Sequence, residues 1–150
     1  LHREKKSCSG PCARACIVPC NPGYGGLVQV HMAHVVLVED DALVRKLLEK
    51  RLVEAGWQVS ALRDGRTLLH QLNEHPADLI LLDLGLPHGD GLALVEDLRM
   101  RGIDTPVMVL TAYNLPHLYA TVRSTGANEL VQKPYDPEDL ILRMRRLLAA

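Results

Sequence analysis

Acidic, hydroxyl and lysine side chains follow four of the apolar, strand-like segments of this sequence, each at the carboxyl end of its segment. They are Glu39 with Asp40, Asp83, Thr111 and Lys133. The carboxyl ends of strands in an open α/β sheet face a common crevice, so these distant stretches should deliver their polar side chains to one edge. Three carboxylates brought together there would repel one another. A hard divalent cation with oxygen ligands relieves that repulsion, and we expect Mg²⁺.

One carboxylate of such a site could act as a nucleophile towards phosphorus. Asp83 is the best placed, because apolar Leu82 and Leu84 flank it. Lys133 would supply a positive charge, and Thr111 a hydroxyl donor, for the oxygens of an incoming phosphoryl group. Taken singly, Thr111 could be a helix cap and Lys133 a solvated surface charge. Such explanations would have to coincide at four strand ends, so the combination favours a phosphorylation site.

The segments that carry these residues alternate between strand and helix. Short apolar runs predict strands at residues 34–38, 58–62, 78–83, 106–110 and 129–132. Apolar residues at helical spacing predict helices at residues 44–55, 65–74, 89–101, 116–125 and 136–148. Asp41 and Asp136 are the expected N-caps of the first and last helices. This alternation predicts an α/β fold, a doubly wound five-stranded parallel sheet with five helices on its two faces.

Composition bounds the possible functions. The chain has 150 residues, of which 47% are hydrophobic and 23% charged, so it can build one core of ordinary domain size. Its formal net charge of −1 argues against direct contact with nucleic acid as its main role. No apolar run of about 18 residues occurs, so we expect no membrane span.

The first 32 residues differ from the remainder. They hold four basic residues and one acidic residue, and all the cysteines of the chain, Cys8, Cys12, Cys16 and Cys20. A spacing of four would align thiolates on one helix face for zinc, but Pro11 and Pro19 interrupt such a helix. We therefore expect residues 1–32 to be a non-native or flexible extension, with a zinc site or disulfides as alternatives. A domain at residues 33–150 without cysteine suits the reducing cytoplasm.

Four segments of the chain carry a resemblance to a known family. They are VLVEDD at 36–41, DLILLDLGLPHGDGL at 78–92, PVMVLTA at 106–112 and VQKPYDPEDL at 131–140. Through them residues 34–149 resemble the receiver domain of two-component response regulators, the CheY-like family. The resemblance implies a flavodoxin-like sheet with strand order 2-1-3-4-5.

The resemblance also implies a role for each acidic residue of the predicted edge. Asp83 would be the phosphoacceptor and would also contact Mg²⁺. Asp40 would be a direct metal ligand, and Glu39 would bind the ion directly or through water. The backbone carbonyl of Gly85 would complete the protein's share of the ligands.

The remaining site residues would serve the phosphoryl group and the response to it. By resemblance, Thr111 and Lys133 would bind phosphoryl oxygens, and the Lys133–Pro134 peptide bond would be cis. The phosphoryl donor would be a sensor histidine kinase. The switch would involve Thr111 and residue 130, where relatives usually carry Tyr or Phe. This chain has Leu130, which brings the usual aromatic switch into question and favours backbone shifts instead.

The last helix, PEDLILRMRRLL, resembles that of OmpR-like transcription factors, whose receivers dimerise through the fourth helix, the fifth strand and the fifth helix. Arg143, Arg145 and Arg146 could pair there with acids such as Glu129 across a two-fold axis. A solvated basic helix face is the alternative, and the fourth helix lacks the acidic opening usual in that branch. The output would be transcription regulation if the domain is part of a longer protein; the alternative is a stand-alone regulator or docking module.

Two other classes share parts of this pattern. A flavodoxin-type FMN binder has the same topology, but its first loop must receive phosphate, whereas Glu39, Asp40 and Asp41 would repel it. A Mg²⁺-dependent phosphohydrolase would place a second acid two residues after its nucleophile, where this chain has Gly85. Both differences favour phosphotransfer signalling over these alternatives.

Overall fold

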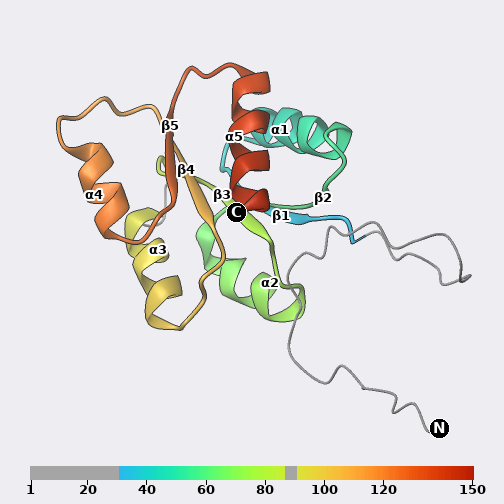
Figure 1. Ribbon diagram of the computed structural model, residues 1–150, viewed down its shortest axis with the longest axis horizontal. Helices are drawn as coiled ribbons and strands as arrows, with labels where there is room; N and C mark the ends of the chain where they lie inside the picture. The colour runs from blue at the N-terminus through green and yellow to red at the C-terminus, as the bar shows by residue number, and fades with distance from the viewer. Residues whose placement is uncertain (1–30, 87–90) are drawn as a thin grey trace, which may run out of the picture. The chain divides into compact units, whose positions relative to one another are not determined.

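The computed structural model describes residues 31–86 and 91–150, and within them the strands form one five-stranded parallel sheet (Figure 1). The strands are β1 His34–Val38, β2 Gln58–Leu62, β3 Leu79–Asp83, β4 Val107–Thr111 and β5 Glu129–Gln132. Their order across the sheet is β2-β1-β3-β4-β5, and every neighbouring pair runs parallel. The predicted fold class and strand order are confirmed.

The helices follow the strands as the apolar spacing predicted. They are α1 Ala42–Glu54, α2 Leu68–Glu74, α3 Gly91–Met100, α4 Leu118–Ser124 and α5 Pro137–Ala149. A 3₁₀ turn, η1 Gly65–Thr67, opens the segment that we expected to be helical from residue 65. The fourth helix is shorter than predicted, because His117 takes the left-handed conformation with φ of 67° and the α-helix begins only after it.

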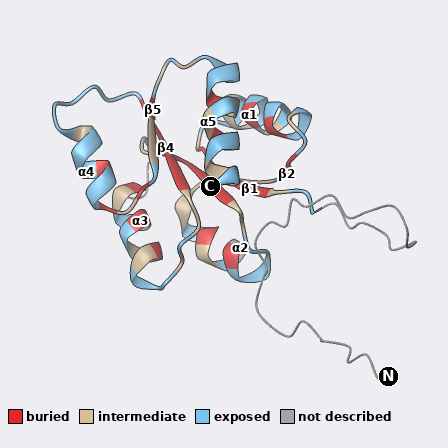
Figure 2. Ribbon diagram, in the orientation of Figure 1, coloured by how far each residue is buried: buried red, intermediate tan, exposed pale blue. Residues whose placement is uncertain are grey.

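Apolar side chains bury both faces of the sheet. In Figure 1, α1 and α5 cover one face, and α2, α3 and α4 cover the other. Along β1, Val35 and Leu37 pack towards α1 and α5, whereas Val36 and Val38 pack towards the opposite layer. Every residue of β1, β3 and β4 is buried, as the red strands of Figure 2 show. Strands buried on both faces explain the nearly continuous apolar runs of the sequence.

The strand register brings the carboxyl ends of neighbouring strands to the same level. Val38 at the end of β1 lies opposite Leu82 of β3. Thr111 at the end of β4 lies opposite Gln132 at the end of β5. The polar residues at or just beyond these positions therefore emerge along one edge, which is the edge predicted to hold the site.

Both predicted N-caps are present and fix where the flanking helices begin. The Asp41 carboxylate accepts hydrogen bonds from the amides of Leu43 and Val44, each at 2.9 Å. The Asp136 carboxylate accepts from the amides of Glu138 and Asp139 at 2.8 and 3.0 Å. Each cap is worth about 1 kcal/mol, and each starts its helix a few residues after a strand that ends at the site.

The extension expected at residues 1–32, with its four cysteines, lies almost wholly outside the described residues, so its nature stays a prediction. Residues 31–150 form a compact unit. In the described ranges, no helix is both long enough and apolar enough to span a membrane.

The inner face of α1 offers a test of the packing. Leu52 is fully buried and Leu47, on the same helix, is 56% exposed. Leu52→Ala should lower the free energy of unfolding by about 2–5 kcal/mol, because it leaves a cavity between α1 and the sheet. Leu47→Ala should change it by less than about 0.5 kcal/mol. Urea denaturation measures both, and equal losses would contradict this assignment of the core.

Candidate functional site

Lys133 joins two carboxylates that lie far apart in the sequence. Its Nζ atom is 3.0 Å from Oδ2 of Asp83 and 3.3 Å from Oε2 of Glu39. The two acidic residues are almost completely buried, with 5% of Asp83 and 1% of Glu39 exposed. Three side chains from the ends of β1, β3 and β5 therefore meet at the predicted edge of the sheet.

The carboxylates also form a cluster suited to a metal ion. Glu39, Asp40 and Asp83 each offer an oxygen, and these oxygens all lie within 4.8 Å of one another. Asp40 is more exposed than the other two, so the cluster opens to solvent on its side. A set of hard oxygen donors fits Mg²⁺, which binds through carboxylates and keeps several waters.

Backbone amides hold the two buried carboxylates in place. Oδ1 of Asp83 accepts a hydrogen bond from the amide of Gly85 at 3.0 Å, and Oε1 of Glu39 accepts one from the amide of Asp41 at 3.1 Å. Each carboxylate thus gives one oxygen to the backbone and the other to Lys133. A Cβ atom at Gly85 would lie 3.5 Å from Asp83 Oδ1, so the glycine leaves that flank of the carboxylate uncovered.

Thr111 ends β4 at the same edge and is buried. Its Oγ1 accepts a hydrogen bond from the amide of Tyr113 at 2.9 Å, and its carbonyl accepts one from the amide of Lys133 at 2.7 Å. The Thr111 hydroxyl therefore forms a hydrogen bond within its own loop, while the Thr111 carbonyl links β4 to the backbone of Lys133. The Lys133–Pro134 peptide bond is cis, as predicted.

The cluster shifts the ionisation of two of its members. Burial raises the pKa of Glu39, and the charge of Asp83 adds to the rise, although the Asp41 amide and Lys133 oppose it. For Lys133, burial alone would lower the pKa, but the hydrogen bond and charge of Asp83 and the charge of Glu39 outweigh it, so the pKa is raised. The lysine therefore keeps its proton at neutral pH and offsets part of the negative charge.

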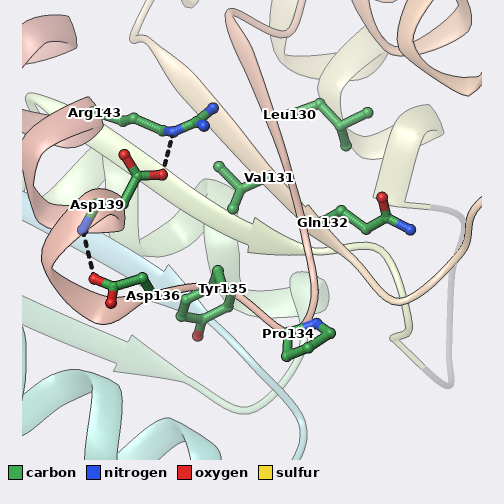
Figure 3. Close-up of a pocket in the computed structure, with 8 residues that line it drawn as sticks. All are labelled: Leu130, Val131, Gln132, Pro134, Tyr135, Asp136, Asp139 and Arg143. Atoms are coloured by element: carbon green, nitrogen blue, oxygen red, sulfur yellow. Dashed lines mark hydrogen bonds and ion pairs between the residues drawn. The ribbon is translucent and has the colours of Figure 1, made fainter.

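A separate, open pocket of about 400 Å³ lies between β5 and the start of α5 (Figure 3). Its lining includes Leu130, the residue at the predicted switch position, and Arg143 of the predicted dimer face. The Arg143 guanidinium is 2.8 Å from Asp139 and 3.1 Å from Glu129 of the same chain. Arg143 and Glu129, which we expected to pair across a two-fold axis, therefore pair within one chain.

Arg145 lies away from that face. Its guanidinium stacks 5.3 Å from the ring centre of Trp57 and donates a hydrogen bond to the carbonyl of Ala55 at 3.1 Å. Residues two positions apart on a helix do not share a face, so Arg143 and Arg145 point to different neighbours. The structure thus separates two residues that the sequence analysis had grouped.

Sequence reasoning also missed one residue beside the cluster. Nη1 of Arg45 donates hydrogen bonds to the backbone carbonyls of Glu39 at 2.8 Å and Asp40 at 3.1 Å. The available signal was position, because Arg45 follows the Asp41 cap by about one helical turn and so lies at the site end of α1.

Comparison with known proteins agrees with this fold. The family model of the response regulator receiver domain matches residues 35–145. The chain is 42% identical over 117 residues to the virulence transcriptional regulatory protein PhoP of Salmonella choleraesuis, covering 78% of this chain and 52% of that protein. It is 39% identical over 114 residues to the transcriptional regulatory protein PhoP of Escherichia coli, covering 76% and 51%.

Among solved structures, the chemotaxis protein CheY4 of Vibrio cholerae superposes with a TM-score of 0.73 at 29% identity, covering 78% of this chain and 99% of that one. The chain belongs to the response regulator receiver-domain family. Its similarity to transcriptional regulators confirms the predicted resemblance to the OmpR-like branch. The chain spans about half the length of the curated relatives that it matches.

The raised pKa of Glu39 predicts how stability depends on pH without metal. A carboxyl group whose pKa is higher in the folded state favours folding most at pH values below its ordinary pKa of 4.5. That contribution is lost as the pH rises through the folded-state pKa. Relative to Glu39→Gln, whose amide does not ionise, the wild type should therefore lose stability across this window. Urea denaturation in EDTA at a series of pH values measures the difference, and a relative gain with rising pH would contradict the assignment.

Proposed function

We propose that this receiver domain accepts a phosphoryl group on Asp83 from a phosphohistidine of a sensor histidine kinase, in a reaction that needs Mg²⁺. The observation that carries the proposal is the contact of Lys133 with Asp83 at 3.0 Å, within a cluster of three carboxylates. A carboxylate so placed has a cation beside the oxygen that would attack phosphorus. The protein acts on its own aspartate, so the only reactions that it catalyses are its own phosphorylation and dephosphorylation.

The proposed metal ligands are the carboxylates of Glu39, Asp40 and Asp83, with the backbone carbonyl of Gly85. Oxygen atoms of the three carboxylates within 4.8 Å of one another support this assignment. When bound, Mg²⁺ would neutralise charge on the carboxylates and on the phosphoryl oxygens. Because the cluster is open on the side of Asp40, water and phosphoryl oxygens have access to the remaining positions.

The side chains of the domain would then orient the transfer. An oxygen of Asp83 forms a bond to phosphorus while the bond from phosphorus to the histidine nitrogen breaks, and the histidine leaves with that electron pair. The Gly85 amide keeps the Asp83 carboxylate from rotating, and the Lys133 ammonium moves from carboxylate to phosphoryl oxygen. The barrier falls through positioning and electrostatics, since the domain itself has no proton to transfer in this step.

Thr111 would couple the phosphoryl group to the surface. Its hydroxyl would donate to a phosphoryl oxygen, and the loop after β4 would move with it. Leu130 packs with the layer that includes α4, so a shift there would change the surface of α4, β5 and α5 by selecting between two packings. This surface is also the proposed homodimer face. Of the residues first expected there, Glu129 and Arg143 lie on it, whereas Arg145 contacts Trp57 instead.

The proposed downstream role of the domain is inferred from its relatives. Their names as transcriptional regulators support a role in transcription for a longer protein that contains this domain. A stand-alone regulator or docking module is the alternative. We place the exchange with the kinase in the cytoplasm, which suits the lack of cysteine in residues 33–150.

Replacing the proposed phosphoacceptor tests the central step. Asp83→Asn should reduce phosphorylation by acetyl phosphate and Mg²⁺ to background, because an amide oxygen cannot form the acyl phosphate. Intact-mass spectrometry measures the added phosphoryl group, and EDTA should abolish labelling of the wild type. Asp97→Asn is the matched control, since Asp97 pairs with Arg101 on the surface of α3 and should leave labelling unchanged. Labelling of Asp83→Asn to the wild-type extent would refute the assignment.

A further inference from the structure

Arg45 is a charged residue whose bonds go to the backbone of the site. One nitrogen, Nη1, donates to the carbonyls of both Glu39 and Asp40. The side chain is partly buried, and within the described ranges it makes no ion pair with a carboxylate. It therefore does not neutralise the acidic cluster by direct contact. It binds instead to the segment from which two of the carboxylates project.

That segment lacks the support of regular structure. β1 ends at Val38 and α1 begins at Ala42, so the carbonyls of Glu39 and Asp40 fall between the last strand residue and the first turn of the helix. Carbonyls in such positions need another partner, and Arg45 supplies one donor to both. The Glu39 amide is bonded to the carbonyl of Leu62 at 3.1 Å, so Arg45 completes the fixation of that residue's backbone.

The need for this fixation follows from the charges. Like charges that are close together lower their energy by moving apart, and a free loop would let the carboxylates of Glu39 and Asp40 turn away from Asp83. We infer that Arg45 is a positioning residue of the metal site, which holds the loop between β1 and α1 so that its two carboxylates converge with Asp83. The inference rests on the proposed function, because it presupposes that the cluster binds Mg²⁺.

A second effect of Arg45 would act in the opposite direction. Its positive charge lies near the cluster and would weaken cation binding through space. Removing it should therefore tighten cation binding if charge dominates, and weaken cation binding if positioning dominates.

Three substitutions of Arg45 separate the two effects. Arg45→Met removes both charge and donors, Arg45→Gln keeps an amide donor on a shorter side chain without the charge, and Arg45→Lys keeps the charge with a less suitable donor.

The test is a titration of the full chain with Mn²⁺, which takes the same oxygen ligands as Mg²⁺ and can be counted by electron paramagnetic resonance. Mg²⁺ then displaces it to give its own affinity. Positioning predicts that Arg45→Met weakens metal binding by about tenfold or more, as loss of a supporting partner does at other metal sites. Arg45→Gln and Arg45→Lys should each recover part of the loss. Lys46→Met is the matched control, because Lys46 is the next residue of α1, exposed and equally charged, and should leave the affinity near that of the wild type.

Two further measurements distinguish a positioning role of Arg45 from a general effect on the stability of the fold. Unfolding in EDTA shows whether each variant is folded before metal is added. The second is labelling of Asp83 by acetyl phosphate as a function of Mg²⁺ concentration. Arg45→Lys should reach the wild-type extent of labelling at saturating Mg²⁺. It should need a higher Mg²⁺ concentration than the wild type to reach half of that extent.

The outcomes are distinct. Metal affinity that is unchanged or higher in both Arg45→Met and Arg45→Gln would overturn the inference and leave the proposed function intact. A loss of stability in EDTA without a loss of metal affinity would overturn it in the same way, as a purely structural role. A wild-type protein that binds neither ion would refute the proposed function itself.

Discussion

Repulsion among carboxylates at the carboxyl end of the sheet is the constraint to which the rest of the site responds. Two of the three carboxylates are buried, where charge is hardest to stabilise. Lys133, at the end of β5, offsets part of their negative charge. It lies 94 residues from Glu39 and 50 residues from Asp83 in the sequence. The balance is incomplete, since the pKa of Glu39 remains raised by its burial and by Asp83. Residual negative charge at a cluster of oxygen donors would favour the binding of a divalent cation.

The sheet makes this arrangement possible because its two apolar faces hold the strands rigidly while the loops at one edge carry the chemistry. Residues of β1 pack alternately towards the α1–α5 layer and the opposite layer, so a shift of β1 along the sheet would disrupt packing on both faces. The short connections at the site edge are then anchored by Asp41 at the start of α1 and Asp136 at the start of α5. Rigid strands and anchored loops are what a site needs if charged groups are to stay close together.

The sequence was informative wherever a local pattern determined the outcome. Continuous apolar runs located β3 and β4, and the polar residues at strand ends located the carboxylates and Lys133, because parallel strands must end at a common edge. Contacts of long side chains were not predictable in this way, since they depend on the rotamer and on the packing of neighbouring elements. The bonds of Arg45 to two carbonyls and the pairing of Arg143 with Glu129 in one chain belong to that group. The left-handed backbone of His117 before α4 was also missed, because no glycine or asparagine marks that position in the sequence. The roles assigned to the site residues remain predictions.

The stacking of Arg145 on Trp57 gives the domain an intrinsic optical probe. Trp57 is the single tryptophan of the chain, and it precedes β2 at the edge of the sheet opposite to the carboxylates. Its indole contacts the guanidinium of a residue on α5, so its emission depends on how that helix sits against the start of β2. A displacement of α5 against the start of β2 would thus change the fluorescence of Trp57.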